Sequence, residues 1–142
     1  MMIFSGSSNK PLAEKIAKHL TISHFPLDTH IFPDGEQRIK ISQQVLDKNT
    51  IIVQSAGMPT DQNYMQLFFA IDALKRSGAK SVTAIISYLG YQRQDHVFRE
   101  GEARSMEVIS TILQSLGIDR VITSDLHSVK IVEIFKTPLI EV

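Results

Sequence analysis

Short apolar and β-branched runs alternate along this chain with segments whose apolar residues recur at helical spacing. The strand-like runs are residues 2–4, 50–54, 81–87 and 120–124, and helical patterns fill the stretches after them. Strands that alternate with helices are typical of an α/β domain built on a mostly parallel sheet. We therefore predict an α/β fold, with a mostly parallel sheet flanked by helices, in one domain over residues 1–142.

The expected helices have recognisable beginnings and ends. Pro11 suits the first turn of a helix, and Thr60 or Asp61 and then Ser105 are predicted to cap the helices that follow. Gly78 is predicted to end the second helix and Gly117 the third. The second helix has a stripe of core positions that share one face: Tyr64, Leu67, Phe68, Ile71 and Leu74.

Residues 21–41 break the alternation. Two prolines exclude a helix there, and Ile39 and Ile41 alternate with charged residues as in a half-buried strand. Pro33, Asp34 and Gly35 form a turn sequence between the strand pieces. We expect a small β-hairpin around residues 29–41, and this local sequence alone favours a structural turn at least as much as a binding site.

The composition excludes several classes of function. Basic and acidic residues number 15 each, so the basic excess that a duplex-binding surface needs is missing, and no nucleic-acid partner is expected. The chain has no cysteine, which excludes disulfides and thiolate catalysis. No apolar run is long enough for a membrane span, and the N-terminus has no signal-peptide pattern, so a soluble, cytoplasmic protein is the default expectation.

Three polar clusters lie at or beyond the carboxyl ends of predicted strands: Gln54-Ser55, Arg93-Gln94-Asp95 and Asp125-Leu126-His127. The carboxyl ends of parallel strands meet at one edge of the sheet, where such folds bind ligands. The small-residue turn at residues 5–9 precedes a helix and is a possible anion site, although many α/β units begin this way without a ligand. The interpretation without a ligand is favoured for this turn.

The side chains at this edge suggest a phosphorylated ligand. Arg93 can bind phosphate as a fork, and Gln94 suits a nucleobase or ribose. Asp125 and His127 are one residue apart, so in an extended segment they face the same way and could hold a divalent cation, or His127 could act as a base. A helix-capping Asp beside a surface His is an equally good interpretation. Neither a P-loop nor a dinucleotide fingerprint is present.

Taken together, these motifs make the chain resemble the N-terminal half of ribose-phosphate pyrophosphokinase, over essentially its whole length. In chain order they are Phe4-Ser5-Gly6 with Leu12-Ala13, Phe32-Pro33-Asp34-Gly35-Glu36, Ile52-Val53-Gln54-Ser55, Asn63-x-Met65, Ile71-Asp72-Ala73-Leu74-Lys75-Arg76, Tyr88-Leu89-Gly90-Tyr91-Gln92-Arg93-Gln94-Asp95 and Asp125-Leu126-His127. After Asp95 stand His96 and Val97, where bacterial members usually place basic residues, and the Gly101-Glu102 pair is closer to archaeal members.

The resemblance implies transfer of the diphosphoryl group of Mg-ATP to ribose 5-phosphate, which gives phosphoribosyl pyrophosphate and AMP. It implies an ATP-binding set, with the adenine stacked on Phe32: Phe32, Asp34, Gly35, Glu36, Arg93 and Gln94. It also implies Mg²⁺ on His127 with Asp125 assisting, and His127 and Arg93 as catalytic residues. The site would be shared between the subunits of a homo-oligomer.

The resemblance covers only the ATP-side half of a two-domain synthetase, so the second half, with most of the ribose 5-phosphate site, is expected beyond these 142 residues. Phosphoryl transfer needs groups from both halves, and this piece alone is therefore expected to be inactive. One alternative is a non-catalytic, synthetase-like regulatory subunit. Another is a phosphosugar-binding α/β module, which would bind ligand without preferring adenine.

Overall fold

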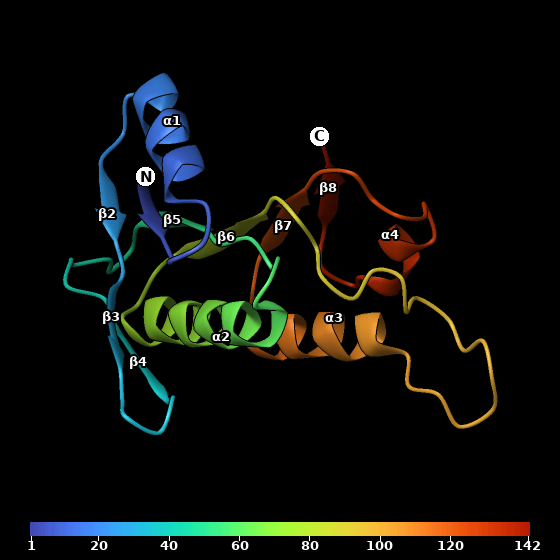
Figure 1. The fold of residues 1–142 in the computed structure, drawn as a ribbon. Helices are drawn as coiled ribbons and strands as arrows, with labels where there is room; N and C mark the ends of the chain where they lie inside the picture. Colours follow the sequence, from blue (N-terminus) through green and yellow to red (C-terminus); the bar gives the residue numbers. More distant parts are fainter.

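The structure is a computed structural model that describes residues 1–142, and it is layered around a parallel sheet (Figure 1). The elements, in chain order, are β1 (Met2–Ser5), α1 (Lys10–Leu20), β2 (His24–Pro26), β3 (Asp28–Ile31), β4 (Gln37–Lys40), β5 (Asn49–Val53), α2 (Thr60–Arg76), β6 (Ser81–Ile86), α3 (Ser105–Ser115), β7 (Arg120–Thr123), α4 (Ile131–Ile134) and β8 (Leu139–Glu141). The predicted α/β fold is confirmed.

The main sheet has six strands in the order β2-β1-β5-β6-β7-β8, and every neighbouring pair is parallel. The chain starts at β1, moves to β2 on one side, and then adds β5 to β8 on the other side. Helix α1 lies on one face of the sheet, and α2 and α3 lie on the other (Figure 1). The strand order therefore reverses between β1 and β5, which defines the topological switch point of the sheet.

Two hydrophobic clusters hold the layers together. The larger one joins β-strand residues such as Ile52 and Val82 to the apolar stripe of α2 and to α3 and α4. The predicted stripe on α2 is buried throughout, with Leu67, Ile71 and Leu74 fully inaccessible to solvent. The smaller cluster lies on the opposite face, where α1 packs on β1 and β5. Burial on both faces explains the nearly continuous apolar runs of the strands.

The predicted hairpin is present as the two-stranded antiparallel pair β3–β4, whose register matches Asp28 with Lys40. It protrudes from the body of the molecule beyond the end of the sheet (Figure 1). Ile39 packs against the larger core cluster. Directly before the hairpin, β2 forms an edge strand on β1 that the prediction of a generally extended segment had not assigned.

Both predicted side-chain caps are wrong, whereas the predicted glycine stops are confirmed. Thr60 and Ser105 are the first residues of their helices, and neither helix has a side-chain cap. The Ser105 hydroxyl donates instead to Gln94 Oε1 at 2.5 Å. Gly78 and Gly117 follow the helices with φ of +82° and +77°, which glycine adopts without strain.

Asp119 joins the end of α2 to the start of β6. Its carboxylate accepts hydrogen bonds from Lys75 Nζ and from the Val82 N–H, both at 2.7 Å. Burial by itself would raise the pKa of the Asp119 carboxyl, but these two hydrogen bonds lower it below its ordinary value.

No helix of the structure combines the length and the apolar character needed to cross a bilayer.

Candidate functional site

The crevice between the carboxyl ends of β1 and β5 is filled by the protein's own side chains. The Ser8 N–H donates to Gln54 Oε1 at 3.1 Å, and the Ser8 hydroxyl donates to the Ser55 carbonyl at 2.7 Å. Gln66 Oε1 accepts from both the N–H and the hydroxyl of Ser7, at 2.6 and 2.8 Å. Switch-point crevices are the usual ligand sites of such sheets, but here amide oxygens occupy the positions that a ligand would take.

This arrangement settles two of the sequence predictions. The turn at residues 5–9 is not an anion site, because the N–H groups of Ser7 and Ser8 already have partners. Gln54 belongs to the interior, with 1% of its surface exposed, so the Gln54-Ser55 cluster does not present its amide to a ligand. Gln54 Nε2 instead donates to Asn63 Oδ1 at 3.1 Å.

The loops after β6 and β7 form the remaining part of the carboxyl edge, and Gln92 joins them. Its Nε2 donates to the Asp125 carbonyl at 3.3 Å, and its Oε1 accepts the His127 N–H at 2.9 Å. A second link runs from the Ser124 hydroxyl to the Ser87 carbonyl at 2.7 Å. The loop that carries Arg93 and the loop that carries His127 are therefore held side by side by direct hydrogen bonds.

Arg93 and Gln94 are exposed and line one hollow of about 530 Å³ together with residues of the 96–103 segment. Gln94 is fixed at both ends, since its backbone carbonyl accepts the Met106 N–H at 3.2 Å and its side chain accepts the Ser105 hydroxyl. No ion pair engages the Arg93 guanidinium. A free guanidinium at the rim of a hollow can bind a phosphate group.

The backbone around Asp125 differs from the extended segment that the spacing suggested. Asp125 has a φ of 52°, in the left-handed region, so the argument that alternation places its side chain beside that of His127 is wrong. Both side chains are nevertheless exposed at the end of β7. No group of three or more His, Asp or Glu side chains is arranged to hold a metal ion.

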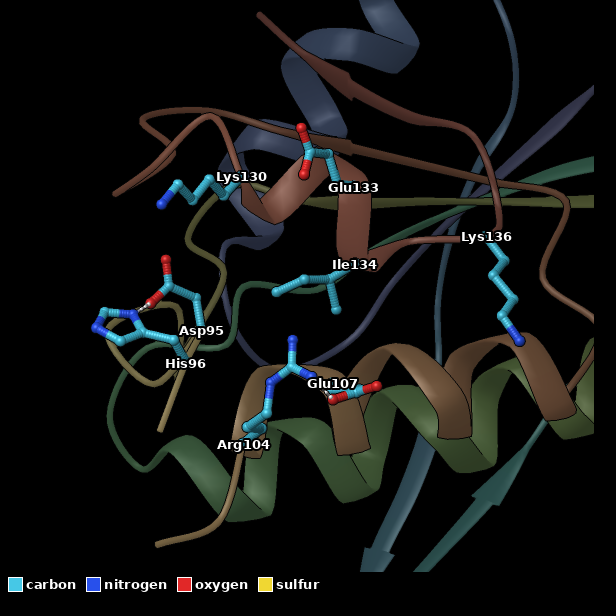
Figure 2. Close-up of a pocket in the computed structure, with 8 residues that line it drawn as sticks. All are labelled: Asp95, His96, Arg104, Glu107, Lys130, Glu133, Ile134 and Lys136. Atoms are coloured by element: carbon cyan, nitrogen blue, oxygen red, sulfur yellow. Dashed lines mark hydrogen bonds and ion pairs between the residues drawn. The ribbon is translucent and has the colours of Figure 1, made fainter. Parts of the chain in front are cut away.

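Asp95, whose role the sequence left open, is buried and paired with a neighbour. Its carboxylate lies 2.5 Å from His96 Nδ1, and this hydrogen bond lowers the pKa of the Asp95 carboxyl. Figure 2 shows the pair at one side of a hollow of about 520 Å³, with Arg104 directly before α3, Glu107 on α3 and residues on and beside α4 on the other sides. Charges of both signs line this hollow in equal number when His96 is neutral.

The β3–β4 turn presents a second group of candidate residues. The Phe32 ring is 39% exposed and meets the His30 ring edge-on, with centroids 4.8 Å apart. The turn is closed by the Phe32 N–H, which donates to the Glu36 carbonyl at 2.8 Å, and by the Glu36 N–H, which donates to Asp34 Oδ1 at 3.1 Å. Gly35 has a φ of +91° at its tip, a conformation that favours glycine.

The two groups of candidate residues line different hollows of one chain. Gly35 and Glu36 line a hollow of about 510 Å³ against α2, whereas Arg93 and Gln94 line the one beside residues 96–103. The structure thus places Arg93, Gln94, Asp125 and His127 on linked loops. It places the hairpin residues elsewhere.

Reasoning from sequence did not predict that three side-chain amides are buried and organise these loops, namely those of Gln54, Gln66 and Gln92. All three are less than 7% exposed. A pattern pointed to one of them: Asn63, Gln66 and Ala70 share a face of α2 at helical spacing, next to the apolar stripe. Two amides on a buried face need polar partners: the turn after β1 provides those of Gln66 Oε1, and Gln54 and the Gly57 carbonyl provide those of Asn63.

Comparisons with known proteins decide the family. Residues 1–117 match the model of the N-terminal domain of ribose phosphate pyrophosphokinase. The chain belongs to this family. It is 38% identical over 137 residues to the ribose-phosphate pyrophosphokinase of Methanobrevibacter smithii, covering 96% of this chain and 46% of that protein. It is 40% identical over 140 residues to that of Ralstonia nicotianae, covering 98% and 44%.

A solved structure supports the same assignment. The fold matches the crystal structure of phosphoribosylpyrophosphate synthetase from Mycobacterium smegmatis with a TM-score of 0.94 and 32% identity. The match covers 99% of this chain and 47% of that one. The chain therefore spans about half the length of the ribose-phosphate pyrophosphokinases that it matches.

Proposed function

We propose that this chain is the ATP-side half of a ribose-phosphate diphosphokinase, an enzyme that transfers the diphosphoryl group of Mg-ATP to ribose 5-phosphate. The observation that carries the proposal is the Gln92 link, which holds the Arg93-Gln94 loop against the Asp125-Leu126-His127 loop at the carboxyl edge of the sheet. Phosphate and metal chemistry then share one rim. The names of the relatives support the reaction class.

Each candidate residue has a role that its chemistry suits. Arg93 neutralises phosphate charge as a fork donor, and Gln94 hydrogen-bonds the nucleotide. Phe32 is an exposed ring on which adenine can stack. Asp34 and Glu36, with Gly35 at the tip of the turn, meet the polar edge of the base.

The donor set at the end of β7 fits a magnesium ion that arrives with its nucleotide. His127 and Asp125 are two donors at most, too few for a closed cage of side chains. Magnesium usually takes one or two protein ligands and completes its shell with water and phosphate oxygens. When bound, the ion would neutralise the charge of the transferring phosphates.

The separation of the two hollows favours a site shared between subunits. The hairpin of one chain would supply the adenine wall, and the Arg93 loop of its neighbour would supply the phosphate contacts, in a homo-oligomer. Residues 1–142 would form the ATP-side domain of the synthetase. Ribose 5-phosphate would bind mainly in its second half. The isolated piece would then bind nucleotide but not turn over.

Calorimetric titration of the 142-residue chain with ATP, with and without Mg²⁺, tests the binding half of this proposal. We expect magnesium-dependent binding that requires association of the chain, measured in parallel by sedimentation. Ribose 5-phosphate serves as the competing probe, because a phosphosugar-binding module would take it without preferring adenine. An associated sample that binds no adenine nucleotide would contradict the proposal.

Replacing His127 by Ala in the full-length enzyme should abolish turnover and leave the fold intact, as judged by circular dichroism. The matched control is His19→Ala, which removes an exposed imidazole from the last turn of α1. This variant should keep normal activity. Near-normal activity of the His127 variant would remove this residue from the proposed metal site.

Replacing Phe32 by Ala should raise the KM for ATP by about 10-fold to 100-fold, because stacking of a base on an aromatic ring contributes on the order of 1–3 kcal/mol. The KM for ribose 5-phosphate should stay nearly unchanged. Ile31→Ala, which removes an exposed apolar side chain beside it, is the control. An equal change in both KM values would rule out the stacking role.

A further inference from the structure

A chain of side-chain amides connects the filled crevice of the sheet to the β3–β4 hairpin. Gln66 lies on α2 and has only 3% of its surface exposed. Its Oε1 accepts two hydrogen bonds from Ser7, so its Nε2 points the other way, where it donates to Gln37 Oε1 at 3.2 Å. Gln37 Nε2 in turn donates to the Gln62 carbonyl at 3.3 Å.

Because of the position of Gln37, its hydrogen bond with Gln66 affects the placement of the β3–β4 hairpin. Gln37 is the first residue of β4 and directly follows Glu36 at the turn. The hairpin has two strands of four residues and pairs with no strand of the main sheet. An isolated two-stranded hairpin is only marginally stable in water, so its placement depends on contacts with its support. These contacts include the packing of Ile39 on the core and the two hydrogen bonds of Gln37.

The orientation of the Gln66 amide is determined by its partners. An ionised carboxylate at this position could accept from Ser7 but could not donate to Gln37, and an apolar side chain could do neither. One buried carboxamide therefore ties the turn after β1 and the first residue of β4 to the same helix. The hydrogen bond to Gln37, at 3.2 Å, is within the ordinary N–H···O range, and the one from the Ser7 N–H is shorter, at 2.6 Å.

We infer that Gln66 and Gln37 are positioning residues that hold the β3–β4 hairpin in place on α2. The Gln66–Gln37 hydrogen bond would then determine the position of Phe32 and Glu36 in a nucleotide site shared between subunits, a consequence that rests on the proposed function. Neither glutamine touches the nucleotide in this scheme. They act through the hairpin.

Gln37→Ala is the principal test, because it removes the link to the hairpin and leaves both Gln66–Ser7 hydrogen bonds in place. Gln37→Ala removes both hydrogen bonds of the Gln37 side chain, so hydrogen exchange should show the amides of residues 28–40 exchanging roughly 30-fold faster than in the unmodified chain, the loss expected for two ordinary hydrogen bonds. Amides of β5 and β6 should be unaffected. Gln44→Ala changes an exposed glutamine after β4 that makes no side-chain hydrogen bond, and should have no effect.

A double-mutant cycle with Gln66→Leu separates positioning from general destabilisation. If the two amides act through their mutual hydrogen bond, the double variant should loosen the hairpin by less than the product of the two single effects, because that shared bond can be lost only once. Effects that multiply would show that each glutamine acts independently, which overturns the inference. Unchanged hairpin exchange in Gln37→Ala would also overturn it, whatever happens to binding.

Titration of the same variants with Mg-ATP tests the connection to function. Affinity should fall in Gln37→Ala, by no more than the factor by which hairpin exchange rises, and stay unchanged in Gln44→Ala, since the apparent affinity scales with the fraction of time that the hairpin is ordered. Faster hairpin exchange with unchanged affinity would remove the hairpin from the nucleotide site. That outcome contradicts the proposed adenine wall and leaves the positioning of the hairpin itself in place.

Discussion

The filled crevice makes Gly6 a position where one added methyl group should be strongly destabilising. A Cβ at Gly6 would lie 2.0 Å from Gln54 Oε1 and 2.6 Å from Gln66 Oε1. Neither distance is tolerable for a carbon and an oxygen that are not bonded, so in Gly6→Ala both amides have to move by about an ångström. That movement breaks their hydrogen bonds to the N–H groups of Ser7 and Ser8.

The magnitude follows from the burial of the two amides. Gln54 and Gln66 are 1% and 3% exposed, so an oxygen that loses its donor cannot turn to water. Each buried polar group left without a partner costs about 1–3 kcal/mol. Two such groups give a loss of about 3 kcal/mol in the free energy of unfolding, or roughly 10 °C in Tm for a chain of this length.

Urea denaturation followed by circular dichroism measures this loss directly. Gly57→Ala is the matched control, because the nearest atom to its added Cβ, Ser55 Oγ, is 4.0 Å away. The stability of that variant should stay within about 0.5 kcal/mol of the unmodified chain. A loss below about 1 kcal/mol in Gly6→Ala would refute the account of a crevice closed by rigid, buried amides.

Three further predictions concern other parts of the chain. Gln92→Leu removes both hydrogen bonds to the 125–127 loop and should cost about 2 kcal/mol in urea denaturation, with weaker Mg-ATP binding by calorimetry. Asp119→Ala should cost about 1 kcal/mol at neutral pH, since its ion pair is partly exposed. The folded-state pKa of Asp119 is below its ordinary value of 3.8, so its contribution is complete above that value and is lost as the pH falls through the folded-state pKa. The free energies of unfolding of the unmodified chain and of Asp119→Ala should therefore converge in strong acid. Leu74→Ala, at a fully buried position, should cost about 2–5 kcal/mol in the same assay.

The fold was predictable because periodicity is a property of many residues at once. The alternation of strand-like and helical segments, the stripe on α2 and the turn at Pro33-Asp34-Gly35 each correspond to an element of the structure. Edge strand β2 escaped prediction because its three residues include a proline and have no clear alternation. The Ser105 cap was wrong because its hydroxyl donates to Gln94, 11 residues earlier in the chain, and not to its own helix.

The candidate site was predictable in its exposed residues but not in the residues that support them. Arg93, Gln94 and His127 stand out as polar side chains directly after strands. Gln92 stands among them in the sequence and differs only in direction, since it points inward and bonds to a loop 33 residues away. The inward direction of the Gln92 side chain accompanies a φ of 65° at Tyr91, a backbone conformation that the sequence pattern does not predict.

Buried glutamines recur wherever this chain must hold a loop at the carboxyl edge, and the chemistry of the carboxamide explains why. Gln92 donates to a carbonyl of the 125–127 loop and accepts an N–H of the same loop. Gln54 and Gln66 each accept from the turn after β1 and donate elsewhere. A carboxylate or an ammonium group could satisfy only one side of each pair and would add the cost of a buried charge. Neutral supports also leave the charge of Arg93 and the donors at the end of β7 free for a ligand. Burial thus divides the polar residues of this edge into those that hold the loops and those that remain exposed at the rim, where we propose that the ligand binds.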